Sequence, residues 1–75
     1  MMEKIYLLKI LDENKKILVE TMFANLNDAQ ELMTLELNSK NMSNEPIFKQ
    51  SSIAFITILT QNQLKRQLNK GRKIY

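Results

Sequence analysis

The chain has 75 residues and a mass of 8.8 kDa, which is the size of one small domain. Its content of 44% apolar and 25% charged residues is ordinary for a folded protein and too apolar for a disordered one. It contains no cysteine and no histidine, so it lacks disulfides, thiolate nucleophiles, the commonest general base and the usual transition-metal ligands.

These absences lead us to expect a protein that is not an enzyme. A phosphate-binding loop is rich in glycine, and this chain has one glycine and one proline. We therefore expect no catalytic residues, no metal, no cofactor and no small-molecule substrate. The longest uncharged apolar run, Ile53–Leu59, is far short of the ~20 residues that span a bilayer, and we expect neither a membrane association nor a secretory signal. The expected location is the cytoplasm.

Charge is divided unevenly along the chain. Residues 1–45 hold all eight acidic residues and five lysines, whereas residues 46–75 hold six basic residues and no acidic one. The overall net charge of +3 therefore combines an acidic segment with a strongly basic one. Such an asymmetry indicates an interaction with a partner.

The first apolar runs predict a β-hairpin over residues 4–23. Lys4–Leu11 and Ile17–Phe23 are short and rich in β-branched, leucine and aromatic residues. Between them lies the polar run 12–16, in which we expect Asn14 to adopt the left-handed conformation of a tight turn.

A helix is predicted over residues 26–39, capped by Asn25 or Asn27. Apolar residues recur in it at the helical period, which predicts one face that packs on a core: Leu26, Ala29, Leu32, Met33 and Leu37.

Residues 47–60 are predicted to be extended. Pro46 biases its neighbour away from the helical conformation, and the run 53–60 is dense in β-branched and aromatic residues. Two alternatives stay open: a break into two strands at residues 50–52, and a helix starting at Ser51. A short basic helix is then predicted over residues 62–70, capped by Thr60 or Asn62, with Leu64 and Leu68 packed inward. Gly71 would end it, and residues 71–75 would form a tail.

The element order β-β-α-β-α predicts a small α+β domain. We expect a three-stranded, mostly antiparallel sheet in the order 2-1-3, with the helices packed on it. The third strand would lie at an edge of the sheet although both of its faces are apolar. An exposed apolar edge strand tends to pair with another chain. We therefore predict a homodimer whose interface includes Ile53, Phe55, Ile56 and Ile58.

The basic C-terminal segment is the first candidate for a partner-binding site. Its predicted residues are Lys65, Arg66, Lys70, Arg72, Lys73 and the terminal Tyr75. The competing interpretation is a solvated helix end whose cations suit the negative end of the helix dipole, followed by a free or disordered terminal aromatic residue. A secondary acidic surface is predicted at Asp28, Glu31 and Glu36, although acids early in a helix also suit its dipole.

Two hypotheses for function follow. The first is a protein-binding module, an adaptor or inhibitor. The Asn-, Lys- and Ile-rich composition is typical of AT-rich coding DNA and would suit an accessory protein of a bacterium or of its phage or plasmid. The second is a small nucleic-acid-binding protein that grips phosphates with the C-terminal basic strip. A net charge of +3 with eight acidic residues is low for a dedicated nucleic-acid binder, so we favour a protein partner.

Overall fold

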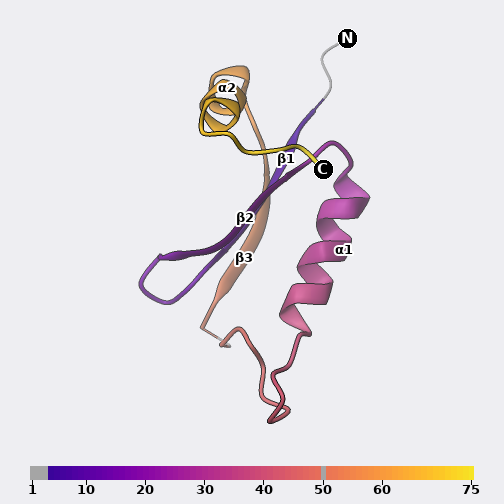
Figure 1. Cartoon of the computed structure of the whole chain (residues 1–75), viewed down its shortest axis with the longest axis vertical. Helices are drawn as coiled ribbons and strands as arrows, with labels where there is room; N and C mark the ends of the chain where they lie inside the picture. The colour runs from indigo at the N-terminus through magenta and orange to yellow at the C-terminus, as the bar shows by residue number, and fades with distance from the viewer. Residues whose placement is uncertain (1–3, 50) are drawn as a thin grey trace.

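The computed structural model describes residues 4–49 and 51–75 of the chain. Its elements follow in the order β1 (Tyr6–Leu11), β2 (Ile17–Phe23), α1 (Leu26–Leu37), β3 (Ile53–Ile58) and α2 (Gln61–Asn69). The strands form one sheet in the order β2-β1-β3, and both pairings are antiparallel. The predicted α+β class and the strand order 2-1-3 are thus confirmed. Figure 1 shows α1 and α2 on opposite sides of this sheet.

The turn between β1 and β2 is built around one aspartate. The side chain of Asp12 accepts hydrogen bonds from the backbone N–H groups of Asn14 and Lys16, both at 2.8 Å. The residue with positive φ is Lys15, at 65°, so the prediction that Asn14 takes the left-handed conformation is wrong. Because the carboxylate already fixes Asn14, the chain reverses one residue later.

A β-bulge follows this turn. Ile10 pairs with Val19 and Leu11 pairs with Ile17, so Leu18 is the extra residue on β2. Leu18 lines a pocket together with Phe48, which packs against the core under α1. The bulge therefore moves Ile17 to the sheet face opposite α1, since residues paired across a sheet project from the same face.

The main core lies between the sheet and α1. Leu8 and Ile10 of β1 are fully buried there, together with Phe23 and with Ala29 of α1. Asn25 caps the helix by accepting a hydrogen bond from the backbone N–H of Asn27 at 2.8 Å. The helix ends at Leu37, short of the predicted residue 39.

The third strand is shorter than the predicted extended run. β3 covers only Ile53–Ile58, so the helical alternative from Ser51 is wrong. Residues 47–49 lie outside any strand, and residue 50, inside the predicted break, lies outside the described residues. Directly before β3, the backbone N–H of Ser52 donates to the carbonyl of Lys49 at 2.9 Å.

The second helix is fixed at both ends by local contacts. Thr60 and Gln63 form a capping box, in which each side chain accepts a hydrogen bond from the backbone N–H of the other residue. Gly71 ends the helix with a φ of 80°, a conformation that glycine adopts without the strain of a Cβ. Leu64 packs against a second, smaller core of Ile5, Leu7 and Met22.

Candidate partner-binding surface

The sheet face opposite α1 is covered only at one end. The strand register places three cross-strand rows of residues on it: Met22, Leu7 and Thr57; Glu20, Lys9 and Phe55; and Ile17, Leu11 and Ile53. Leu7 and Met22 of the first row belong to the small core on which Leu64 of α2 packs, whereas Thr57 is exposed. The third row is uncovered, with Ile17 49% and Ile53 55% exposed. We call this third row, together with Phe55, the open apolar row.

The middle row carries the charged contact that holds the C-terminal segment on this face. The carboxylate of Glu20 forms an ion pair with Lys9, with an N–O distance of 3.8 Å, and a second ion pair with Arg72. The Glu20 side chain is only 8% exposed, whereas those of Lys9 and Arg72 are 29% and 40% exposed. The guanidinium of Arg72 also donates a hydrogen bond to the side chain of Gln67 on α2. This network neutralises the charge of Glu20 and attaches α2 to the sheet.

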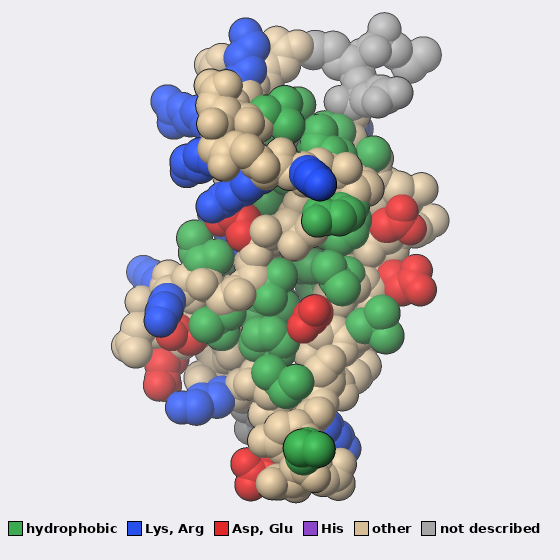
Figure 2. Space-filling view, viewed as in Figure 1, with side chains coloured by type: hydrophobic (Ala, Val, Ile, Leu, Met, Phe, Trp, Pro, Cys, Tyr) green, Lys and Arg blue, Asp and Glu red, His purple; other side chains and the backbone are tan. Residues whose placement is uncertain are grey.

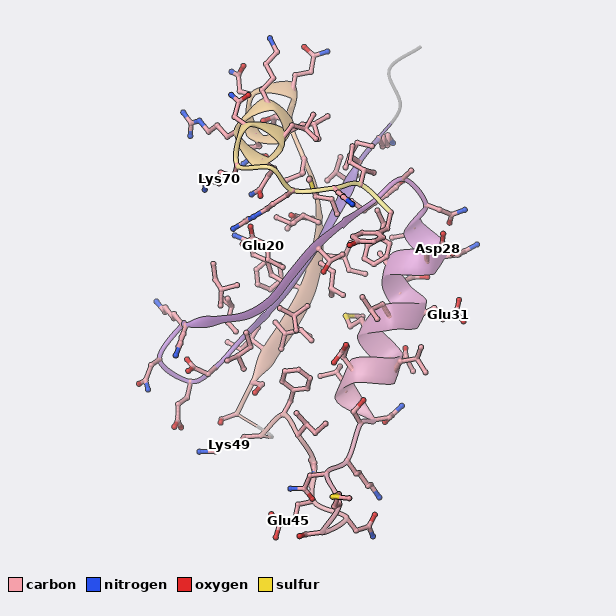
Figure 3. The ribbon with its side chains drawn as sticks, viewed as in Figure 1. Glu20, Asp28, Glu31, Glu45, Lys49 and Lys70 are labelled. Carbon is pink, nitrogen blue, oxygen red and sulfur yellow. The ribbon has the colours of Figure 1, made fainter. Side chains whose placement is uncertain are left out.

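All five predicted cations are exposed on or after α2, and four of them form no ion pair among the described residues: Lys65, Arg66, Lys70 and Lys73. We call them the α2 cations. Figure 2 shows Lys and Arg side chains gathered over α2, and Figure 3 shows Lys70 on the side of the molecule that faces away from α1. Because α2 packs on the sheet face opposite α1, the α2 cations border the same face as the open apolar row.

The remaining basic residue, Arg72, is placed differently from what the sequence suggests. Its ion pair with Glu20 and its hydrogen bond to Gln67 engage it within the fold. Leu68 also differs from the prediction, because it is 46% exposed while Leu64 alone packs inward. An exposed leucine beside the α2 cations adds an apolar group to this surface.

Tyr75 is neither a free anchor nor a disordered end. Its backbone N–H donates to the carbonyl of Met22, and its carbonyl accepts from the N–H of Ala24, both at 2.9 Å. Its ring lies 6.2 Å from that of Phe23, centroid to centroid. The side chain keeps 68% of its surface exposed, so the tail presents an aromatic ring from a fixed position on the edge of β2.

The predicted acidic surface lies on the other side of the molecule. Asp28 and Glu31 are exposed on α1, and Figure 3 shows both side chains pointing away from the sheet. Glu36 is half-buried farther along the same helix. The structure therefore separates the acidic residues of α1 from the α2 cations by the thickness of the sheet.

The four predicted dimer-interface residues all lie in β3, but they face different ways. Ile56 packs against the core under α1, and Phe55 is half-buried on the opposite face of the sheet. Ile53 and Ile58 are each 55% exposed. Only part of this strand is thus available through its side chains, and the rest only through its backbone at the free edge of the sheet.

Four shallow pockets on the described surface hold at most two carboxylates each. One of about 460 Å³ lies between the start of β1 and α2, with Ile58, Leu59 and Leu64 in its lining and Lys4 as its charged residue. Another of about 360 Å³ lies between β2 and the tail, and its one carboxylate, Glu20, is already paired with Arg72. Within residues 4–49 and 51–75, three or more acidic residues do not come together as metal ligands would.

Sequence reasoning missed Glu20, Leu11 and Ile17 as members of this surface. The signal for Glu20 was present, since a lone acid interrupts an apolar strand that returns past Lys9. Ile17 could not be placed, because the bulge at Leu18 reverses its face.

Comparison with protein-family models finds no matching family, and searches of curated proteins and of solved structures find no match either. Neither helix of the described chain has the length and apolar character needed to cross a membrane.

Proposed function

We propose that this chain is a small, non-enzymatic protein-binding module, an adaptor or inhibitor that acts by docking on a larger protein. The observation that carries the proposal is the arrangement of one sheet face, which bears exposed apolar side chains at one end and the α2 cations at the other. Protein interfaces combine apolar anchors with a polar, solvated rim in this way.

The chemistry of this face defines the partner that would fit it. Ile17 and Ile53 flank Leu11 across the sheet and offer a flat apolar contact. The α2 cations lie at the other end of the same face, and within the described chain the acid of the row between them, Glu20, is neutralised by Lys9 and Arg72. The complementary partner is a folded protein with an apolar patch next to clustered Asp and Glu side chains.

One observation favours the second candidate, a nucleic acid. α2 contains no acidic residue, so its exposed surface is uniformly positive or neutral. Phosphate contacts need no more than this. Base stacking needs several exposed aromatic rings, and this surface offers few: Phe55 in the three rows is half-buried, and the exposed ring of Tyr75 lies beside Phe23 at the β2 edge. The uncovered Ile17 and Ile53 have no role in phosphate binding, which is why we favour a protein.

Two further parts of the proposal rest on composition alone. The Asn-, Lys- and Ile-rich sequence supports an origin in a phage or another mobile element. The absence of cysteine is compatible with the reducing environment of the cytoplasm, which we propose as the place of action.

A titration with duplex DNA and with RNA separates the two candidates. The test variant replaces the four α2 cations with Gln and keeps Arg72, because Arg72 holds the fold. A phosphate-binding protein that uses these four cations would show a log–log salt slope of about −3 to −4, which the variant would lose. We expect only weak binding at physiological salt, equal for both nucleic acids and without that slope. Tight binding with the full slope would replace the protein proposal with the nucleic-acid one.

A further inference from the structure

The C-terminal tail pairs with the β2 edge of the sheet, whereas no described segment pairs with the β3 edge. On the β2 edge, Ile74 pairs in parallel with Met22, and Tyr75 hydrogen-bonds to the backbones of Met22 and Ala24. The same strand carries a β-bulge and the nearly buried Glu20. Tail pairing, bulges and inward-pointing charges are devices that prevent a strand edge from pairing with another chain.

The outer edge of β3 presents unpaired backbone groups. The N–H of Leu59 donates to the carbonyl of Ile5 at 2.9 Å, which makes these two residues a hydrogen-bonded pair. Such pairs alternate along an antiparallel ladder, so Phe55 and Thr57 also direct their backbone groups toward β1. Ala54, Ile56 and Ile58 therefore direct theirs outward. Among the described residues, none hydrogen-bonds to these outward groups.

The β3 edge also lacks the devices that protect the β2 edge. Its sequence, Ile-Ala-Phe-Ile-Thr-Ile, contains no charge, no proline and no glycine, and its pairing with β1 has no register shift. The nearest charged residues along the chain are Lys49 and Lys65. An uncharged, regular edge of this kind is a template for a further strand.

We propose that a second copy of this chain pairs with that edge, β3 to β3, antiparallel about a twofold axis at Ile56. In this register Ile56 faces its own copy, and Ala54 faces the partner's Ile58. Each of these is a hydrogen-bonded pair, so all the outward groups of β3 find partners. The small side chain of Ala54 leaves room for the large, 55% exposed Ile58 that meets it. This inference concerns the sheet edge and does not depend on the docking function proposed for the sheet face.

The flank of α1 next to this edge is also apolar. Leu32 lines a pocket with Thr21, Phe23 and Tyr75, so its flank of the helix faces β2. At about 100° per residue, Leu26 and Leu37 lie on the opposite flank, beside β3. They are 38% and 42% exposed. The twofold axis brings this flank toward the same flank of the partner, which covers apolar surface that the single chain leaves in water.

The size of the contact sets its strength. A six-residue strand is about 20 Å long, so the paired edges bury less than the roughly 800 Å² per partner of a standard stable interface. The dimer should therefore form in the micromolar range and depend on concentration. No charged residue lies in the pairing strand, so added salt should not weaken it, in contrast to a contact made by the α2 cations.

Sedimentation velocity over about 1 to 200 µM protein tests the proposal, since it spans the range where micromolar association shows. The wild-type chain should shift from monomer to dimer mass. Ile58→Lys should weaken association about tenfold or more, because each dimer loses two cross-strand pairs and gains charge at the edge. Ile17→Lys is the matched control, a similarly exposed isoleucine on the other side of the sheet. A wild-type monomer throughout, or equal weakening by the two variants, would overturn the proposal.

Cysteine variants test the register, because the natural chain has no cysteine. Ile56→Cys should give a disulfide-linked dimer on mild oxidation, since residue 56 faces its own copy. Ile58→Cys should cross-link much more slowly, since it faces the partner's Ala54. A cooperative melting transition in circular dichroism shows that each variant is folded. Faster cross-linking through residue 58 than through residue 56 would contradict the twofold axis at Ile56.

Discussion

Arg72, in the segment after α2, forms an ion pair with Glu20 on β2. The contact joins residues far apart in the sequence and fixes the C-terminal segment on the sheet face opposite α1. Lys9 approaches the same carboxylate from β1, and the side chain of Gln67, on α2, accepts a hydrogen bond from Arg72. The position of the α2 cations relative to the open apolar row thus depends on a charge network with a nearly buried acid at its centre.

Replacing Arg72 should destabilise the fold more than replacing its acidic partner. Arg72→Gln leaves the carboxylate of Glu20, 8% exposed, with only Lys9 as a charged partner. We expect a loss of about 1–3 kcal/mol in the free energy of unfolding, less than for a fully buried pair because Arg72 is 40% exposed. Glu20→Gln should cost less, because water can solvate the two cations that it leaves. Urea unfolding of both variants measures the difference.

Lys73→Gln is the control for this prediction. Lys73 is the next residue but one after Gly71, is exposed, and is expected to change stability by no more than ~0.5 kcal/mol. Equal stabilities of the Arg72→Gln and Lys73→Gln variants would show that the ion pair with Glu20 contributes nothing to the fold.

The core between β1 and α1 should account for a large share of the stability. Leu8 is fully buried there, so Leu8→Ala should cost about 2–5 kcal/mol, against a total of about 4–11 kcal/mol for a chain of this length. Leu35→Ala is the matched control, since Leu35 is 60% exposed on the same helix that covers Leu8. Thermal melting should show a large loss for the first variant and almost none for the second. Similar melting temperatures would mean that the core is placed wrongly.

Local patterns were sufficient to predict the elements and their order. The short apolar runs of residues 4–23 and the helical apolar period of residues 26–39 are short-range properties, and they follow from which side chains must face a core. The strand order followed from an apolar β1 that must be covered on both faces, together with the connection through α1. Capping depends on residue type at a helix start, so the sequence limits each cap to two residues. The caps in the structure are Asn25, rather than Asn27, and Thr60, rather than Asn62.

The candidate surface could be predicted only in part, since it depends on distant contacts. The sequence shows the α2 cations as a basic run. That Arg72 instead forms an ion pair with Glu20 depends on how α2 packs on the sheet. The pairing of Tyr75 with Met22 and Ala24 likewise needs the tail to reach the β2 edge. Ile17 joins the open apolar row only because of the bulge at Leu18, and no local pattern in the strand predicts that bulge.

Site-specific photo-crosslinking in expressing cells tests whether the sheet face opposite α1 binds a larger protein. A photo-reactive residue replaces Ile17, which is 49% exposed in the open apolar row, or Leu35, which is 60% exposed on α1, as the matched control. We expect a discrete, nuclease-resistant adduct with one larger protein from position 17 and none from position 35. Replacing the four α2 cations with Gln should weaken the adduct. The same adducts from both positions, or adducts that nuclease removes, would contradict the proposed docking.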